Sequence, residues 1–193
     1  MITDEIYERM TYDGRRHVSA ASLPGAYDRT ITLSGFSKTF NMTGWRLGYA
    51  VGRADVLEKM GLIADLVYIC APAPLQHGLA AALPMDDAYY AGMATDYDAR
   101  RTLMAETLDA CGFTHAWPEG AYYAFASFES LRGRPGFEDD RAACTTLIET
   151  AGVATVPGSA FFTNGGGHYL RFCFAKEIDV LEEACRRLRA AFA

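Results

Sequence analysis

Short apolar runs alternate with helix-period patterns along the first half of the chain. Apolar and β-branched residues lead into Asp4, extend over residues 29–33 and run again from 47 to 51, which is the pattern of strands in a largely buried parallel sheet. Between these runs and the middle of the chain, two segments have helical spacing, one over 54–67 with a stripe at Val56, Met60, Ile63 and Val67, and one over 75–83. The alternation predicts an α/β fold.

The second half has a different order of elements. Residues 86–111 have the composition of one long helix, which opens with two aspartates at its positive end and closes at Gly112. Strands are expected at 121–128, 153–156 and 169–174, and helices at 139–151 and 177–192. We therefore expect a smaller α+β domain, joined to the first half by the long helix.

Composition and charge exclude several classes of protein. The chain has 193 residues, half of them hydrophobic, and a net charge of -6 with the charges interspersed. No run of basic residues is interleaved with aromatics, so nucleic acid is not expected as a partner. No apolar stretch is long enough to span a membrane, and the first residues lack the pattern of a signal peptide. We expect a cytoplasmic protein that binds no membrane.

Cysteines and histidines give no sign of a metal site. The five cysteines are scattered and form no CxxC pair, and we interpret them as reduced core residues. The four histidines are equally dispersed. No metal is expected.

The run from Ser34 to Tyr49, SGFSKTFNMTGWRLGY, holds the most informative residue of the chain. Lys38 is one of only three lysines, and Arg46 follows eight residues later. A lysine amine can form a Schiff base with an aldehyde cofactor, and the arginine could return from a short loop to hold a phosphate. The alternative is a solvated loop lysine followed by an ordinary arginine.

This run resembles the cofactor-lysine segment of the class I and II aminotransferases, which are pyridoxal 5'-phosphate (PLP) enzymes of fold type I. The resemblance implies that Lys38 is the catalytic residue, which binds PLP as a Schiff base and then carries a proton. It further implies that Ser37 and Arg46 bind the phosphate, with Ser34 as a further donor. The alternative for either serine is a turn hydroxyl bonded to its own backbone.

The segment Asp4-Glu5-Ile6-Tyr7 resembles the strand-end motif of the same family. The resemblance implies that Asp4 pairs with the protonated pyridine nitrogen of PLP and that Tyr7 donates to its phenolic oxygen. A carboxylate about 4 Å from that nitrogen contributes on the order of 4 kcal/mol at an effective dielectric of 20, or about three pKa units, which keeps the ring protonated. The alternatives are a turn cap for Asp4 and a half-buried aromatic for Tyr7.

Arg171 lies in a third matching segment, residues 168–172, which resembles the small-domain strand whose arginine binds the substrate's α-carboxylate. A guanidinium matches a carboxylate with two parallel hydrogen bonds, and a charge on an apolar strand requires an anionic partner. The alternative is a structural ion pair with a nearby acidic residue. Residues 118–123 and 156–161 also resemble segments of the family's small domain.

The resemblance implies a domain organisation and a reaction. Residues 1–85 would form the C-terminal part of the large PLP-binding domain with a mainly parallel sheet, residues 86–112 the connecting helix, and residues 113–193 the small domain. The reaction would be amino transfer from an amino acid to a 2-oxo acid. Family members are usually homodimers, and residues 71–76 fall where such a segment approaches the partner's phosphate.

The match covers only the second half of the family's pattern, so we interpret the chain as a fragment rather than a shortened gene product. For the chain alone we expect poor solubility and negligible turnover, because an unpaired apolar sheet edge promotes aggregation. Three alternatives stay open: a PLP-dependent lyase of the same fold, a non-catalytic ligand-sensing domain of a transcription regulator, and a degenerate protein without PLP or activity.

Overall fold

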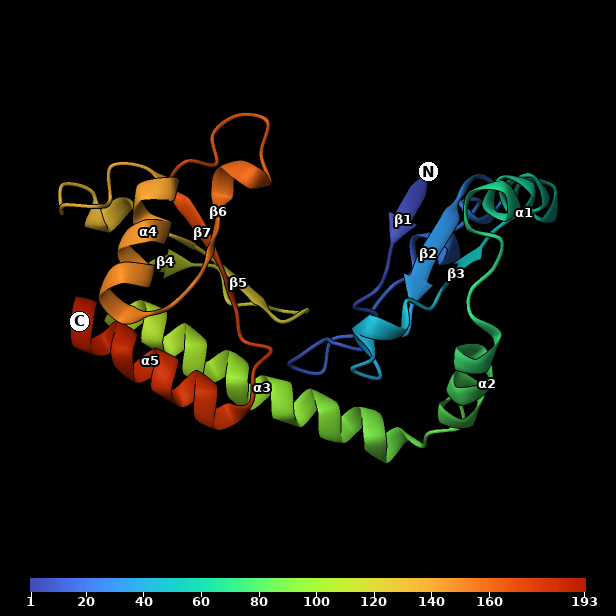
Figure 1. Cartoon of the computed structure of the whole chain (residues 1–193), viewed down its shortest axis with the longest axis horizontal. Helices are drawn as coiled ribbons and strands as arrows, with labels where there is room; N and C mark the ends of the chain where they lie inside the picture. The colour runs from blue at the N-terminus through green and yellow to red at the C-terminus, as the bar shows by residue number, and fades with distance from the viewer. The chain divides into compact units, whose positions relative to one another are not determined.

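The computed structural model describes residues 1–193, which divide into two compact units: unit 1, residues 1–94, and unit 2, residues 95–193 (Figure 1). Unit 1 contains the strands β1 (Ile2–Asp4), β2 (Ile31–Gly35) and β3 (Gly48–Val51), the helices α1 (Ala54–Tyr68) and α2 (Ala73–Ala82), and the first turns of α3 (Asp87–Ala110). Short 3-10 turns lie at Ala20–Ser22, Tyr27–Arg29 and Thr43–Trp45. The α/β fold class is confirmed.

The sheet of unit 1 has the order β1-β2-β3 and is mixed. The strands β1 and β2 are parallel, with Asp4 opposite Leu33, whereas β3 pairs with β2 in the antiparallel direction. The parallel direction expected for all three strands is therefore wrong for β3. The expected deep burial is wrong for both β1 and β3, which are mostly exposed. The physical reason for the direction of β3 is the connection: β2 and β3 are joined by a loop that reverses the chain, without a crossover helix.

Two left-handed residues make this reversal. Asn41 has φ 49° and Arg46 has φ 55°, values that non-glycine residues adopt rarely and that cluster at functional sites. The strands β2 and β3 come closest at Gly35 and Gly48, next to the loop. A Cβ on Gly35 would lie only 2.9 Å from the carbonyl oxygen of Leu47. Glycine is required there because no side chain fits between the strands.

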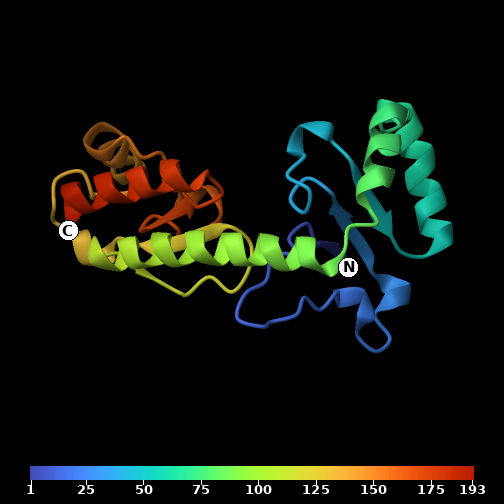
Figure 2. The ribbon, with the colours of Figure 1, turned by 90° about the horizontal axis from the view of Figure 1, so that it is seen from below.

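Unit 2 is an antiparallel sheet with helices on it. The strands β4 (Thr114–His115), β5 (Tyr123–Ser127), β7 (Tyr169–Cys173) and β6 (Val156–Pro157) follow one another across the sheet in that order. The helices are the rest of α3, α4 (Asp140–Ala151) and α5 (Ile178–Phe192), and α5 runs beside the second half of α3 (Figure 2). Short 3-10 turns lie at Glu129–Leu131 and Gly158–Ala160.

Most predicted elements occur within two residues of their expected bounds. The expected strand over 29–33 begins two residues later, the one over 153–156 is reduced to Val156–Pro157, and β4 was not predicted. All five cysteines are free, but the expectation of core positions is wrong for Cys70 and Cys173, which are exposed at the end of a helix and of a strand. None of the helices combines the length and apolarity needed to cross a membrane.

Candidate active site

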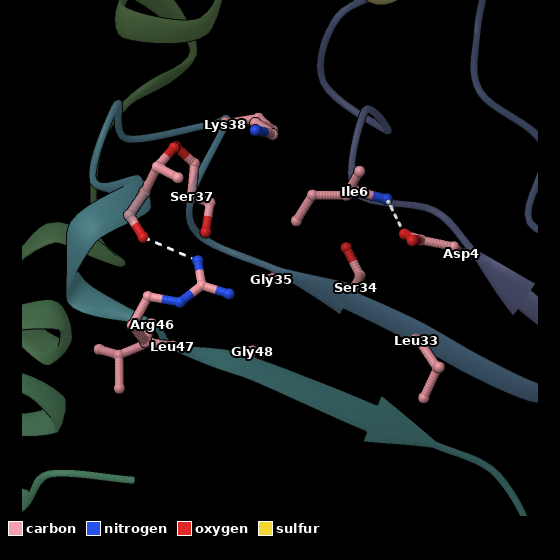
Figure 3. A pocket seen from close by; sticks show the side chains of 11 residues that line it. Asp4, Ile6, Leu33, Ser34, Gly35, Ser37, Lys38, Arg46, Leu47 and Gly48 are labelled. Atoms are coloured by element: carbon pink, nitrogen blue, oxygen red, sulfur yellow. Dashed lines mark hydrogen bonds between the residues drawn. The ribbon is translucent and has the colours of Figure 1, made fainter. Parts of the chain in front are cut away.

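A pocket of about 370 Å³ opens in unit 1 where β1 and β2 end and β3 begins (Figure 3). Its lining comes from the turn after β1, the carboxyl end of β2, the reversing loop and the first residue of β3: Asp4, Ile6, Leu33, Ser34, Gly35, Ser37, Lys38, Thr43, Arg46, Leu47 and Gly48. Four of the predicted site residues, Asp4, Ser37, Lys38 and Arg46, therefore share one pocket. Ligands of α/β folds commonly bind at this end of the strands.

Asp4 is the last residue of β1, and its carboxylate is exposed at the edge of the pocket. Its Oδ1 atom accepts a hydrogen bond of 3.2 Å from the backbone N–H of Ile6, which fixes the turn that follows the strand. In Figure 3, Asp4 lies on the opposite side of the pocket from Ser37 and Arg46. The pocket therefore has an anionic end and a cationic end.

Lys38 lies in the tight turn after β2 and is half-buried. Backbone hydrogen bonds from Phe40 to Phe36 (3.0 Å) and from Asn41 to Lys38 (3.4 Å) hold this turn. The Nζ atom lies 5.9 Å from the centroid of the Tyr7 ring, so the structure brings Tyr7 close to the lysine as well. An ammonium at this distance from a ring face is attracted to it.

Arg46 and Ser37 lie on the same side of the pocket, at the two ends of the reversing loop (Figure 3). The Thr43 hydroxyl donates to the carbonyl of Ser37 (3.2 Å), and the Arg46 Nη1 atom donates to the carbonyl of Thr43 (2.9 Å). No carboxylate pairs with Arg46. Its remaining N–H groups and the nearby serine hydroxyl form a donor set that suits a phosphate.

Ser34 differs from its predicted role. Its side chain is buried, and its hydroxyl donates to the carbonyl of Glu5 (3.3 Å), so it joins β2 to the end of β1. The alternative of a turn hydroxyl bonded to its own backbone is also wrong for Ser34, because this residue lies within β2 and its acceptor belongs to a residue 29 positions earlier in the chain. Ser37 has no such bond to the backbone.

Glu5 was not predicted to have any role, yet it is buried and lies in the chain between Asp4 and Ile6, which both line the pocket. The residue is 7% exposed, and its carboxylate accepts hydrogen bonds from groups of two segments: Thr3, His17 Nε2 (2.8 Å), Ser19 and the backbone of Ala20. Burial alone would raise the pKa of Glu5, but these hydrogen bonds outweigh it and lower the pKa. The sequence signal was the acidic pair Asp4-Glu5 at a strand end, of which one member faces inward.

Arg171 belongs to unit 2, in the middle of β7, opposite Phe125 of β5 and Val156 of β6. Its guanidinium carbon lies 4.1 Å from the centroid of the Tyr123 ring and 4.7 Å from that of Phe161. Its Nε atom is buried and has no hydrogen-bond partner, and no carboxylate pairs with it. The alternative of a structural ion pair is therefore wrong.

The residues of the pocket fit PLP by charge. An anionic side chain at one end suits a protonated pyridine nitrogen, a primary amine suits an aldehyde, and a guanidinium beside a hydroxyl suits a phosphate. The volume lies within the usual range for small-molecule sites. Three observations support this fit: the charged and polar groups that line the pocket, the position of Asp4 on the side opposite Ser37 and Arg46, and the absence of a carboxylate paired with Arg46.

Comparison with known proteins identifies relatives that are aminotransferases, in agreement with the resemblance of the sequence motifs. The family model described as "Aminotransferase class I and II" matches residues 1–188. A probable N-succinyldiaminopimelate aminotransferase of Mycobacterium tuberculosis is 36% identical over 97% of this chain, and an aspartate aminotransferase of Pyrococcus abyssi is 39% identical over 97% of it. The chain covers 49% and 47% of these two relatives, so it spans about half the length of the curated relatives it matches.

Solved structures show the same similarity. The N-succinyldiaminopimelate aminotransferase from Mycobacterium tuberculosis superposes with a TM-score of 0.90 at 36% identity, over 98% of this chain and 49% of that chain. An aromatic aminotransferase from Pyrococcus horikoshii superposes with a TM-score of 0.86 at 37% identity, over 98% of this chain and 50% of that chain.

Proposed function

This chain belongs to the class I and II aminotransferases, and on that premise we propose that it carries the cofactor lysine and the substrate-carboxylate arginine of a PLP-dependent amino-transfer site. The observation that carries the proposal is the single pocket that Asp4, Ser37, Lys38 and Arg46 line together. The substrates would be an amino acid and a 2-oxo acid. The domain ranges 1–85, 86–112 and 113–193 expected from the family stay part of the proposal.

When bound, PLP supplies an electron sink for the bond electrons released at the substrate's Cα. Lys38 would hold the cofactor through its Nζ atom and, once the substrate amine has displaced it, would take and return the Cα proton. The half-buried position of Lys38 in a turn held by backbone hydrogen bonds supports this role, because the amine is oriented without being sealed from solvent. Tyr7, close to Nζ, would donate to the phenolic oxygen.

The two ends of the pocket would bind the two charged parts of the cofactor. Asp4 would pair with the pyridine N–H, and its carboxylate is available for this because its one hydrogen bond, from Ile6, leaves the other oxygen open. Arg46 and Ser37 would bind the phosphate, since charge-assisted hydrogen bonds to an anion are among the strongest in proteins. The left-handed backbone at Arg46 turns its side chain toward that end.

Arg171 would bind the substrate's α-carboxylate. A guanidinium beside two aromatic rings with a buried, unpartnered Nε is costly unless an anion accepts from it, because burial removes the hydration of its donors. A carboxylate that accepts from this guanidinium would remove the cost. This supports a ligand role for Arg171 over a purely structural one.

The proposal extends to partners and location. A homodimer is proposed from the family, with residues 71–76 near the partner's phosphate. A cytoplasmic location is proposed because the five cysteines are all free and no helix could span a membrane.

The test is PLP loading followed by borohydride reduction and peptide mass mapping. We expect a visible absorption band on addition of PLP and a reduced label on Lys38, with no label at that position in Lys38→Ala. Lys59 and Lys176 are the internal controls, because they are exposed lysines outside the pocket. Equal labelling of all three lysines, or none, would contradict the proposed cofactor site.

Turnover is tested separately. The proposed reaction would be measured with an amino acid and a 2-oxo acid, together with product analysis, because the same residues could support elimination. For the chain alone we expect negligible turnover. Ammonia release in place of amino transfer would favour the lyase alternative.

A further inference from the structure

A second pocket of about 440 Å³ lies in unit 1, and it shares no residue with the pocket at Lys38. It is formed by the segment after β1 and the first turns of α3. Its lining residues are Glu8, Arg9, Thr11, Arg15, Arg16, His17, Tyr90, Ala91 and Ala94. Three arginines and one histidine around one glutamate make it strongly basic in a chain whose net charge is -6.

Two acidic groups at or near this pocket form hydrogen bonds with groups other than Arg9 and Arg16. The Oε1 atom of Glu8 accepts from the hydroxyl of Tyr49 (3.2 Å), and Glu5 is occupied by His17 and its other donors. No carboxylate forms an ion pair with Arg9 or Arg16. Two guanidinium groups with unmatched charge therefore line one cavity, and an anion bound there would receive several charge-assisted hydrogen bonds.

One side of the pocket is organised by aromatic packing. The guanidinium carbon of Arg9 lies 4.7 Å from the centroid of the Tyr90 ring. Tyr90 in turn packs edge-on against Tyr89 (5.3 Å between centroids) and in a tilted arrangement against Phe40 (6.5 Å). Because the ring is fixed, the stacked guanidinium loses less freedom when it binds a ligand.

We propose that this pocket, lined by Arg9, Arg15, Arg16 and Tyr90, is a binding site for a small anion of the phosphate class. The guanidinium groups would donate to the phosphate oxygens in pairs, as their planar geometry favours. Ala91, Ala94 and the Tyr90 ring give the site an apolar wall, so its volume suits a phosphorylated small molecule larger than phosphate itself. The site is independent of the proposed amino transfer.

A small anion fits better than an acidic peptide or a nucleic acid. The basic residues are gathered around one cavity by a loop of nine residues and one helix turn, whereas extended polyanions are bound along a stripe of positive charge. Binding of an acidic peptide is the competing outcome of the test. Poly-glutamate serves below as the probe for that outcome.

The test is calorimetric titration of the chain with inorganic pyrophosphate. The variant Arg9→Gln/Arg16→Gln is expected to weaken binding about tenfold or more, which corresponds to a loss of about 1.4 kcal/mol or more in binding free energy. The matched control is Arg29→Gln/Arg141→Gln, which removes the same two charges from exposed positions elsewhere. The control variant is expected to change the dissociation constant for pyrophosphate by less than about twofold, because the loss of two distant surface charges is largely screened by salt.

A third variant separates the two pockets. The titrations are repeated in an Arg46→Gln background, which removes the phosphate donor proposed for the pocket at Lys38, and Arg9→Gln/Arg16→Gln is expected to weaken the remaining pyrophosphate binding in that background by the same factor. Loss of binding in Arg46→Gln, equal weakening in the control pair, or no binding to the native chain would each overturn the proposal. Tighter binding of poly-glutamate than of pyrophosphate would also overturn it in favour of a peptide site. Circular dichroism spectra that match the native chain show that the variants are folded.

Discussion

The two compact units have nearly the same length but bury very different amounts of apolar surface. Of the 26 buried apolar residues, 21 lie in unit 2 and only five in unit 1. Unit 2 closes its own core, with Phe128, Phe137, Phe172 and Phe174 fully buried between the sheet and its helices. Unit 1 has a sheet and two helices but no comparable core. Helices and strands alone therefore do not stabilise a unit. The apolar side chains buried between these elements provide most of the stability.

Two helices of equal length show the difference most clearly. The helix α5 buries Leu181, Cys185, Leu188 and Phe192, whereas α1 buries no residue. The apolar residues of α1 and its end that are more than 60% exposed, which we call the α1 face, are Leu62, Ile63, Leu66, Val67, Tyr68 and Ile69. A contiguous exposed patch of this kind is typical of a surface that another protein surface covers. In unit 1, a hydrogen bond from Thr43 to Ser37 links two residues that line the candidate pocket, and the hydrogen bonds of Glu5 join the end of β1 to residues 17–20.

The largest effect on the free energy of unfolding is expected from one member of a matched pair of leucine-to-alanine substitutions. Leu147 of α4 is 0% exposed and Leu66 of α1 is 86% exposed. We expect Leu147→Ala to lower the free energy of unfolding of unit 2 by about 2–5 kcal/mol, and Leu66→Ala to change that of unit 1 by less than about 0.5 kcal/mol. The two tryptophans, Trp45 and Trp117, report on one unit each, so urea unfolding followed in Trp45→Phe or Trp117→Phe backgrounds measures the units separately. Similar losses in both variants would contradict the difference in burial.

The next prediction concerns the buried carboxylate of Glu5 in unit 1, which accepts hydrogen bonds from His17, Ser19 and Ala20. Glu5→Gln removes the charged acceptor of His17, Ser19 and Ala20 and is expected to destabilise unit 1 by about 1.5–3 kcal/mol at neutral pH. The hydrogen bonds lower the pKa of Glu5 below 4.5, so its stabilising contribution is present above that pH and is lost as the pH falls through the folded-state pKa. The difference between the native chain and Glu5→Gln should therefore shrink below pH 4.5. A difference that is constant from neutral to acid pH would contradict the role of the charge, and Glu58→Gln on exposed α1 is the control.

A helix cap in unit 2 gives a smaller effect. The Oδ1 atom of Asp139 accepts from the backbone N–H groups of Arg141 (2.9 Å) and Ala142 (2.8 Å) at the start of α4. Asp139→Ala is expected to lower the stability of unit 2 by about 1 kcal/mol, and Asp139→Asn by less, because asparagine also caps well. The Trp117 signal during urea unfolding measures both. An equal loss in both variants would mean that the charge of Asp139, and not its cap, is what stabilises α4.

The sequence predicted local features of this chain better than features that depend on distant segments. The bounds of α1 and α3 and the sharing of one pocket by Asp4, Ser37, Lys38 and Arg46 follow from spacing and from the resemblance of contiguous motifs. The direction of β3 was missed because it depends on a reversal at two left-handed residues, and neither is a glycine. The burial of Glu5 was missed because its partners lie 12 to 15 residues away.

The helical stripe of α1 shows a second limit. The spacing of Val56, Met60, Ile63 and Val67 predicted a helix correctly, but periodicity says only that one face is apolar and not what covers it. In α5 the same kind of pattern is buried within its own unit. The sequence of α1 alone therefore does not predict which surface, if any, covers its apolar residues.

The smallest expected effect on stability is also the sharpest test of the α1 face. Leu66→Glu places a charge in the middle of that face, where the native side chain is 86% exposed, so the unfolding free energy of unit 1 should change by less than about 0.5 kcal/mol. If the exposed patch drives self-association, the same substitution should shift sedimentation toward the monomer and raise solubility, because a charge opposes apolar contact between chains. Ile148→Glu is the matched control, since Ile148 is 50% exposed on α4 of the closed unit. If both variants reduced association equally, added net charge would be the cause; a loss confined to Leu66→Glu would assign the association to the open unit.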